Sequence, residues 1–304
     1  MNQSRRTFLK NSAMAVAAAG LLPEGTFAAP AKKRILGIQL YSVREDMGKD
    51  PSGTLRKLAD MGYKYVEHAN YVDRKFYGYG AKEFKSLLDS MGLKMLSGHT
   101  RMDPKHWDDT KKDFTDAWKW TVEDAAIVGQ QYVISPWLDE SLRKTYDDLL
   151  RYMDVFNKCG ELCKKSGMKF GYHNHDFEFS QVLNNQKVFD IILKHTDPGL
   201  VAQQLDMGNL YNGGAVAIAI VMQYPGRFEL MHVKDEIKAT GAGGNEKYES
   251  TVLGQGIVGT RQVADLGKKS GGTYHFIIEQ ESYQGRTPLD CAKEDLAVMK
   301  KWGY

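Results

Sequence analysis

The sequence predicts an α/β fold in which about eight parallel strands close into a single (β/α)8 TIM barrel. Short apolar runs of strand length alternate along the chain with amphipathic stretches of helical spacing. Glycines repeatedly stand between a helical stretch and the next apolar run, where a left-handed helix C-cap suits glycine; they are Gly62, Gly92, Gly129, Gly167 and Gly271. Strict alternation of this kind indicates a parallel sheet covered by helices.

The expected elements follow in chain order. The candidate strands are 34–42, 63–67, 94–99, 132–135, 168–174, 200–206, 228–233 and 274–279. Helical spacing relates Leu55, Leu58 and Met61, and it relates Phe84, Leu87 and Leu88 in the next unit. The remaining helices are expected within 141–165, 213–224, 260–270 and 288–302.

An open, doubly wound sheet with a bound dinucleotide is the main alternative fold. Its glycine-rich fingerprint is expected at the first strand–helix turn, but that turn contains no glycine between Tyr41 and Glu45. A G-x-G-x-x-G pattern does occur at Gly254, Gly256 and Gly259, where it follows a loop and not a strand. The sequence therefore favours the barrel.

Charge and hydropathy narrow the class of protein. The chain has 304 residues and a formal net charge of +3, which argues against a nucleic-acid partner. No internal apolar run approaches the roughly 18 residues of a transmembrane helix, so we expect no stable membrane anchor. The sequence leaves open whether the protein forms a homo-oligomer.

The first 29 residues are typical of a twin-arginine signal peptide. Arg5 and Arg6 precede a small apolar stretch from Ala13 to Leu22, and small residues around Ala29 provide a cleavage site. We therefore expect an exported, periplasmic protein with its barrel in residues 30–304. This pathway carries folded proteins, often with a metal already inserted, and the cysteines Cys159, Cys163 and Cys291 are expected to be buried thiols.

Candidate ligands for a metal ion stand at the ends of four consecutive predicted strands. They are His173, Asp206, His232 and Glu279. The carboxyl ends of barrel strands meet at one rim, where active sites of this fold lie. Imidazole and carboxylate together suit a divalent ion such as Mn²⁺, Co²⁺, Zn²⁺ or Mg²⁺.

Each of these residues also has a simpler explanation. Asp206 can cap the following helix, Glu279 can be solvated, and a single strand-end histidine is often only a satisfied polar residue. Together they are harder to explain without an ion, because unpaired buried charges cost several kcal/mol each and a dication compensates them. The set predicts a metal site.

Short motifs recur along the chain, most of them at or near the ends of the predicted strands. They are Gly37–Ser42, Tyr65–Glu67, Ser97–His99, His173–His175, Leu205–Asn209, His232–Asp235, Leu253–Gly256 and Ile278–Gln280. In this order, the motifs resemble the xylose isomerase-like TIM barrels, also called the sugar phosphate isomerase/epimerase family. The resemblance covers about residues 34–302.

In sugar epimerases of this family, Glu, Asp, His and Glu from strands 5 to 8 hold the metal. The last three match Asp206, His232 and Glu279, whereas His173 replaces the first glutamate. Those epimerases exchange a proton between two glutamates, so the replacement places that exchange in doubt. His175 and Glu178 lie near His173 in the sequence and could supply an alternative base. Inosose dehydratase-like members also carry His-x-His here, and the resemblance thus implies chemistry on a keto-sugar or keto-polyol.

The resemblance implies a small-molecule saccharide substrate and a metal-stabilised enediolate. We expect Glu279 to be the base, His175 the second candidate, and Lys234 to hold the developing oxyanion. Substrate contacts are expected from Glu67, His99, Glu178, Tyr41 and Trp137, with Glu67 and His99 able instead to orient the ligands.

Three functions remain open at this point. The first is a metal-dependent isomerase or epimerase, and the second is a dehydratase or lyase acting on a keto-sugar or keto-glycoside. The third is a non-catalytic exported carbohydrate-binding barrel. The segment 238–256, rich in glycine and polar residues, is long for a βα connection and is expected to act as a lid or specificity loop.

Overall fold

The computed structural model describes residues 34–239 and 247–304. Residues 34–304 form one compact unit. The predicted signal peptide at 1–29 lies outside the described residues. In the part of the chain that is described, no helix combines the length and apolar character needed to cross a membrane.

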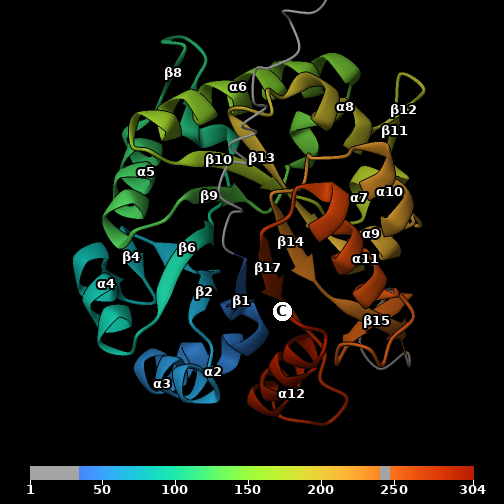
Figure 1. Ribbon diagram of the computed structural model, residues 1–304. Helices are drawn as coiled ribbons and strands as arrows, with labels where there is room; N and C mark the ends of the chain where they lie inside the picture. Colours follow the sequence, from blue (N-terminus) through green and yellow to red (C-terminus); the bar gives the residue numbers. More distant parts are fainter. Residues whose placement is uncertain (1–33, 240–246) are drawn as a thin grey trace, which may run out of the picture. The chain divides into compact units, whose positions relative to one another are not determined.

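Eight parallel strands form a closed barrel, which confirms the predicted fold class. The order around the barrel is β1–β17–β14–β13–β10–β9–β6–β2, so each strand pairs with the next barrel strand in sequence (Figure 1). The bounds are β1 Ile35–Gln39, β2 Tyr65–His68, β6 Lys94–His99, β9 Tyr132–Ser135, β10 Lys169–His173, β13 Val201–Asp206, β14 Leu230–Val233 and β17 His275–Ile278.

Helices surround the barrel and cover its outer face (Figure 1). Their bounds are α2 Arg44–Lys49, α3 Pro51–Met61, α4 Ala81–Ser90, α5 Asp116–Val128, α6 Tyr146–Lys165, α7 Phe177–Ser180, α8 Val188–His195, α9 Met207–Asn212, α10 Ala217–Gln223, α11 Thr260–Leu266 and α12 Pro288–Lys301. Local sequence fixes their ends. In α3, Asp50 accepts a hydrogen bond from Gly53 N, Pro51 occupies the first turn, and Gly62 ends the helix at φ 104°.

The predicted elements are correct in kind, and several bounds differ. The first strand ends at Gln39, because Leu40–Val43 forms a 3₁₀ turn in place of the predicted strand end. The segment 213–224 is not one helix, since α9 starts directly at the end of β13 and α10 follows after a turn. Helices α5 and α8 have no counterpart among the expected segments.

Short antiparallel ribbons are added where several barrel strands end. They are β3–β4–β5 (Tyr71–Val72, Lys75–Phe76, Tyr79–Gly80), β7–β8 (Trp107–Asp108, Asp113–Phe114), β11–β12 (Val182–Leu183, Gln186–Lys187) and β15–β16 (Asp235–Lys238, Tyr248–Thr251). In the last of these ribbons, the segment 238–256 contributes Lys238 to β15 and Tyr248–Thr251 to β16.

Side-chain alternation along the strands creates an apolar layer with a polar layer above it. Residues two apart on a strand share a face, so Leu230 lies below His232, and Ile277 lies below Glu279. Leu230 and Ile277 pack in one small buried cluster with Tyr132, Ile134 and Ala202. The polar layer therefore lies toward the carboxyl ends of the strands.

The larger apolar clusters hold the helices against the sheet. In α6, Cys159 and Cys163 point into one of them and, like Cys291, are buried free thiols, as predicted. Trp118 donates its indole N–H to Cys159 Sγ at 2.9 Å. These thiols belong to the core.

Candidate metal centre and active-site cavity

Four side chains converge at the carboxyl ends of β10, β13, β14 and β17. His232 Nδ1 lies 3.2 Å from Glu279 Oε2 and 3.7 Å from Asp206 Oδ2. His173 Nε2 lies 3.9 Å from the same Asp206 oxygen. One ligand atom from each residue lies within 4.8 Å of every other, and all four residues are buried. The structure thus brings together the four residues predicted as ligands.

The two oxygens of Asp206 have different surroundings. Oδ1 accepts a hydrogen bond from Asn209 N at 2.6 Å and caps α9, as the simpler explanation anticipated. Oδ2 is buried, has no hydrogen-bond partner among the described residues, and faces both histidines. Burial raises the pKa of this carboxyl to about 7. An orphaned buried oxygen beside two imidazoles and a second carboxylate fits a divalent cation.

The imidazole nitrogens that point away from this cluster are held by other side chains. His232 Nε2 lies 2.6 Å from Glu67 Oε1, and His173 Nδ1 lies 3.0 Å from Gln204 Oε1. Gln204 also donates its amide N–H to Glu67 Oε2 at 2.9 Å. Such partners fix the ring orientation and tautomer of a metal-binding histidine. They leave His232 Nδ1 and His173 Nε2 directed at Asp206.

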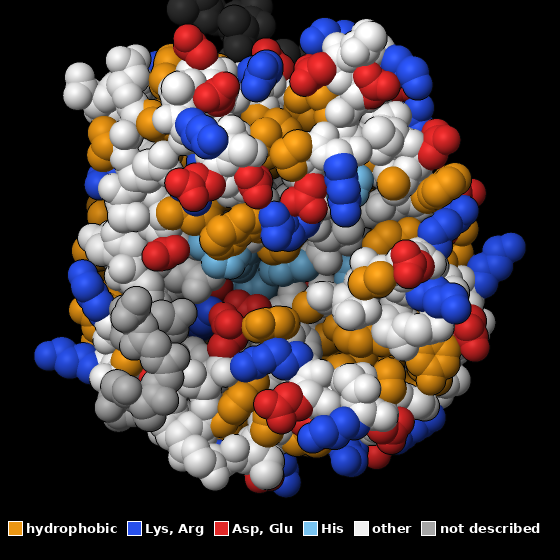
Figure 2. All heavy atoms as spheres, turned by 180° about the vertical axis from the view of Figure 1, so that it is seen from behind, with side chains coloured by type: hydrophobic (Ala, Val, Ile, Leu, Met, Phe, Trp, Pro, Cys, Tyr) orange, Lys and Arg blue, Asp and Glu red, His pale blue; other side chains and the backbone are white. Residues whose placement is uncertain are grey.

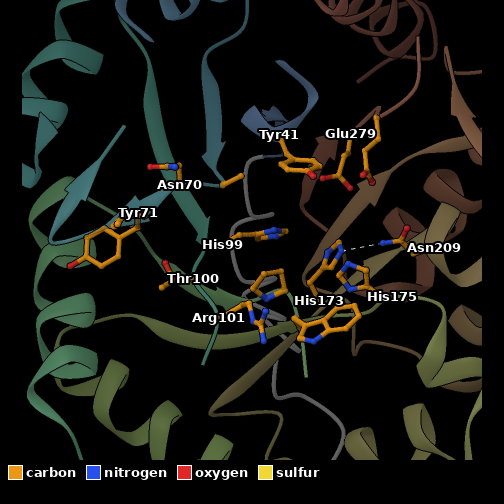
Figure 3. Close-up of a pocket in the computed structure, with 15 residues that line it drawn as sticks. Tyr41, Asn70, Tyr71, His99, Thr100, Arg101, His173, His175, Asn209 and Glu279 are labelled. Carbon is orange, nitrogen blue, oxygen red and sulfur yellow. Dashed lines mark hydrogen bonds between the residues drawn. The ribbon is translucent and has the colours of Figure 1, made fainter. Parts of the chain in front are cut away.

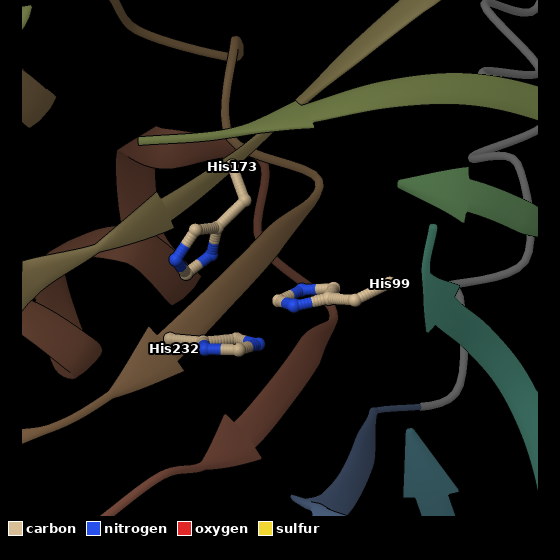
Figure 4. Close-up of side chains that lie close together, drawn as sticks. All are labelled: His99, His173 and His232. Carbon is tan, nitrogen blue, oxygen red and sulfur yellow. The ribbon is translucent and has the colours of Figure 1, made fainter. Parts of the chain in front are cut away.

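His99 adds a third imidazole from β6. Its ring stacks on that of His232 at 5.2 Å and 10°, and Figure 4 shows the rings of His99, His173 and His232 together. These three could also hold an ion by proximity. However, His99 Nε2 is engaged by Gln204 Oε1 at 2.7 Å and Glu67 Oε1 at 3.1 Å. We therefore favour the set with two carboxylates, which has a free oxygen.

Neighbouring charges favour the ionised form of Glu279 and the protonated form of His232. Burial disfavours ionisation of Glu279, but His232 and Lys234 outweigh it and hold the pKa of this carboxyl below its usual range. Burial also disfavours the charged form of His232, yet Glu279 and Glu67 raise its pKa to about 10. A metal bound at His232 Nδ1 would require this ring in its neutral form, since ligand histidines bind as neutral imidazole.

A cavity of about 480 Å³ opens above the cluster. His173 and Glu279 reach it from the cluster, and Figure 3 shows Glu279 beside Tyr41, with His99 and His173 below them in this view. On the space-filled surface, histidine side chains form the floor of a hollow (Figure 2). Its volume is typical of small-molecule sites, which span about 300–1,000 Å³. The other lining residues are Ala69, Asn70, Tyr71, Val72, Thr100, Arg101, Pro136, Trp137, His175, Asn209 and Glu281.

Of the residues predicted to contact substrate, Tyr41, His99 and Trp137 line this cavity, as does His175. Lys234 does not line this cavity but contacts three residues that do. Its ammonium donates to Asn209 Oδ1 at 3.0 Å, forms an ion pair with Glu281, and lies 3.6 Å from Glu279 Oε2. This position is compatible with the predicted electrostatic role.

Two expected substrate contacts do not reach the cavity. Glu67 is buried beneath the cluster and bonds Gln39, Gln204, His99 and His232, a position from which it would orient ligands. Glu178 is also buried, and the prediction that it contacts substrate is wrong for this structure. Its carboxylate accepts from Tyr172 OH and from His175 N. Tyr172 precedes His173 on β10 and faces the outer side of the barrel, which draws Glu178 away from the cavity.

Sequence reasoning missed Gln204, Asn209 and Glu281. Gln204 lies two residues before Asp206 and hence on the same face of β13, a signal that was present in the sequence. Asn209 and Glu281 follow strand ends within three residues of a predicted ligand. Amide and carboxylate side chains at such positions have many structural uses, and their spacing alone does not identify them.

The glycine-rich motif after β16 surrounds an internal carboxylate. Asp235 accepts hydrogen bonds from Gly254 N at 2.8 Å, Gly256 N at 3.1 Å and Val258 N at 3.2 Å. The backbone donors that a nucleotide phosphate would need are therefore used by this side chain. This finding agrees with the rejection of a dinucleotide site.

Comparison with known proteins identifies relatives by sequence and by fold. The chain is similar to three inosose dehydratases of clostridia. The one from Clostridium perfringens is 34% identical over 26% of each chain, and the one from Clostridium beijerinckii is 28% identical over 50% of this chain and 49% of the relative. The one from Clostridium botulinum is 24% identical over 62% of this chain and 65% of the relative. The chain thus spans between a quarter and two thirds of the length of these curated relatives.

Solved structures share the whole barrel. A sugar phosphate isomerase/epimerase from Parabacteroides distasonis has a TM-score of 0.74 at 27% identity, covering 88% of this chain and 98% of that one. The IOLI protein, crystallised with a zinc atom, has a TM-score of 0.67 at 14% identity, covering 88% and 97%. The model of the xylose isomerase-like TIM barrel matches residues 55–302. The chain therefore belongs to the xylose isomerase-like TIM barrel family.

Proposed function

We propose that the protein is a divalent-metal-dependent enzyme that removes a proton beside the carbonyl of a keto-sugar or keto-polyol and expels a β-substituent. The observation that carries this proposal is the buried cluster of His173, Asp206, His232 and Glu279, which meets a small-molecule cavity through one imidazole and one carboxylate. An elimination of this kind needs one base on one face of the substrate. Glu279 satisfies that need.

The residues have distinct parts in this proposal. His173, Asp206, His232 and Glu279 would hold the ion, which when bound supplies a Lewis acid that makes the C–H beside a carbonyl more acidic. Glu279, held ionised by His232 and Lys234 and exposed to the cavity, takes the proton. The Lys234 ammonium stabilises negative charge that develops on the substrate. Tyr41 and Trp137 provide apolar faces for a sugar ring.

The curated relatives support the elimination. The matching relatives bear the name inosose dehydratase, a dehydration of a keto-polyol, and the IOLI protein with its zinc atom supports a metal in this fold. The replacement of a strand-5 glutamate by His173 agrees with this choice, because it removes the second carboxylate of a two-sided proton exchange.

An isomerase or epimerase is the second candidate. His175 lines the cavity from the end of β10, and its Nδ1 is buried without a hydrogen-bond partner among the described residues. In this candidate, His175 is the second base beside Glu279. Solved structures of the same fold named sugar phosphate isomerase/epimerase support this candidate.

Solvent deuterium separates these candidates. Purified protein with Mn²⁺, Co²⁺ or Zn²⁺ is incubated in D₂O with sugars, inososes and 3-keto-sugars, and products are followed by NMR and mass spectrometry. Elimination gives an unsaturated ketone, whereas epimerisation or isomerisation gives a saturated product that carries deuterium. Turnover with no exchange and no unsaturated product would contradict the proton abstraction.

The variant Glu279→Gln distinguishes an enzyme from a carbohydrate-binding barrel. We expect turnover to fall by about 10²–10⁴-fold, the usual contribution of a general base, while saccharide still binds. The control is Glu161→Gln, which alters an exposed carboxylate on α6 outside the cavity. A protein that binds saccharide equally well before and after the change, and never turns it over, is a binder.

We also propose that the protein is exported with residues 1–29 as a twin-arginine signal. Replacing Arg5 and Arg6 with lysine should leave the uncleaved chain in the cytoplasm. N-terminal sequencing of the periplasmic protein identifies the cleavage site.

A further inference from the structure

A second cavity adjoins the first at the mouth of the barrel. Its volume is about 490 Å³, similar to that of the first. His175, Asn209 and Glu281 line both cavities. Each cavity alone falls in the range of about 300–1,000 Å³ that holds a small molecule. Together they offer more room than one sugar ring requires.

Polar side chains mark the boundary between the two cavities. Lys234 lines the second cavity and reaches Asn209 and Glu281, both of which line the two cavities. His175, at the same boundary, has a buried Nδ1 without a hydrogen-bond partner in the described part of the chain. A substrate lying across the boundary would meet donors and an unpaired nitrogen at its middle.

The second cavity has the character of a saccharide subsite. Its remaining walls include parts of α7, α9, β15, β16 and the segment after β17, and they carry hydroxyl, amide and carboxylate groups such as Ser180, Asn212 and Glu236. Tyr248 adds an aromatic ring, which is held edge-on by Tyr211 at 5.0 Å. Hydroxyl-rich ligands use such a mixture of hydrogen-bonding groups and aromatic surface.

We propose that the substrate is a keto-glycoside of two sugar-sized units, with the keto unit in the first cavity and the leaving unit in the second. This inference rests on the proposed function for its chemistry. The first cavity contacts the cluster through His173 and Glu279, so the reacting carbons lie there. The glycosidic oxygen then lies near Lys234, at the boundary.

The reaction is a β-elimination that consumes no oxidant or reductant. A ketone at C3 of the first unit makes the proton at C2 acidic, and Glu279 removes it. The electron pair forms the C1=C2 double bond and the C1–O bond breaks. The departing oxygen, stabilised by the Lys234 ammonium, takes a proton from water, and Glu279 returns its proton to solvent. The products are an unsaturated keto-sugar and a free sugar.

The test compares substrates of one and two units. Methyl 3-keto-α- and β-D-glucopyranoside are compared with the 3-keto forms of maltose and cellobiose, which carry the ketone on the non-reducing ring. Binding is measured by calorimetry on Glu279→Gln, and kcat/KM on the unaltered protein. We expect at least one two-unit compound to bind about 10-fold tighter than its methyl partner and to react with a higher kcat/KM. Equal affinity within both pairs overturns the inference.

Variants then locate the second unit. Asn212→Trp and Ser180→Trp place a large ring in the second cavity, and each should reduce the ratio of two-unit to one-unit kcat/KM by about 10-fold. Ser86→Trp, on the exposed face of α4 and lining neither cavity, should leave the ratio unchanged. An unchanged ratio in both cavity variants overturns the inference. If two-unit compounds bind preferentially but none is cleaved or exchanges deuterium, the two-unit site stands and the proposed function fails.

Discussion

Individual residues in this centre are positioned by partners that do not face the cavity. His232 and His173 each use one nitrogen toward Asp206 and the other toward Glu67 or Gln204. Glu67 receives hydrogen bonds from four side chains of four strands. A single carboxylate thus fixes the orientation of several imidazole rings, and its loss should weaken metal binding.

The variant Glu67→Gln tests this role. We expect metal affinity to fall by about 10–100-fold, the usual cost of losing such a partner, because the amide N–H₂ would face donors. Metal affinity is measured by competition with a chelating dye. Glu178→Gln is the matched control, since this buried glutamate bonds Tyr172 and the His175 backbone and does not contact the four proposed ligands. Equal losses in both variants would contradict a specific role for Glu67.

At the scale of elements, the segment after β16 is tied to the barrel by two buried aspartates. Asp235 accepts three backbone N–H groups of the glycine-rich loop, and Asp295 on α12 accepts Leu253 N at 2.8 Å. The two strands that precede this segment, β15 and β16, line the second cavity, whereas the segment itself does not. The anchored segment thus follows directly on a strand that lines the proposed subsite.

Replacing Gly256 with alanine should weaken this anchor. A Cβ there would lie 2.3 Å from Asp235 Oδ1 and 2.5 Å from the backbone oxygen of Glu236. We expect the free energy of unfolding to fall by about 1–3 kcal/mol, typical of overpacking. Gly48→Ala is the control, since nothing lies within 4 Å of its Cβ, and helix α2 should gain up to about 1 kcal/mol. Urea denaturation measures both, and equal effects would refute the steric argument.

Asp295 should make stability depend on pH. Burial raises its pKa from 3.8 to about 7, so the folded state holds this proton more tightly than the unfolded chain. The resulting stabilisation is complete below about pH 4 and is lost as pH rises through about 7, by as much as about 4 kcal/mol. Asp295→Asn keeps an acceptor for Leu253 and cannot ionise. Relative to the unaltered protein, it should therefore gain stability between pH 5 and pH 8.

Denaturation at these two pH values measures the difference directly. Other buried carboxyls titrate in both proteins and cancel in the comparison. A difference that is the same at pH 5 and pH 8 would show that Asp295 carries no linked proton.

At the scale of the whole molecule, the barrel encloses carboxylates that an ion would compensate. Metal removal by a chelator should therefore lower the Tm. An ion present at about 100 times its Kd adds about 2.7 kcal/mol. Calorimetric scans with and without Mn²⁺, Co²⁺ or Zn²⁺ measure the shift, and Asp206→Asn should abolish most of it. A Tm that no divalent ion changes in the unaltered protein would argue against the metal centre.

The sequence by itself determined the closed parallel barrel and the rim at which the chemistry gathers. Alternation of apolar runs and helical periods is a local property, and the ends of parallel strands meet at one rim wherever the loops go. For this reason His173, Asp206, His232 and Glu279, which lie more than a hundred residues apart at the extremes, were predicted together and were found together.

Only the tertiary structure decided which groups support that cluster and which reach the substrate. Gln204 joins His99, His173 and Glu67 because strands distant in sequence bring them within hydrogen-bond reach. Glu178 turns away because Tyr172 and α7 hold it outside the barrel. Cavities arise where packing leaves space, and packing depends on contacts across the entire fold; no local pattern encodes them.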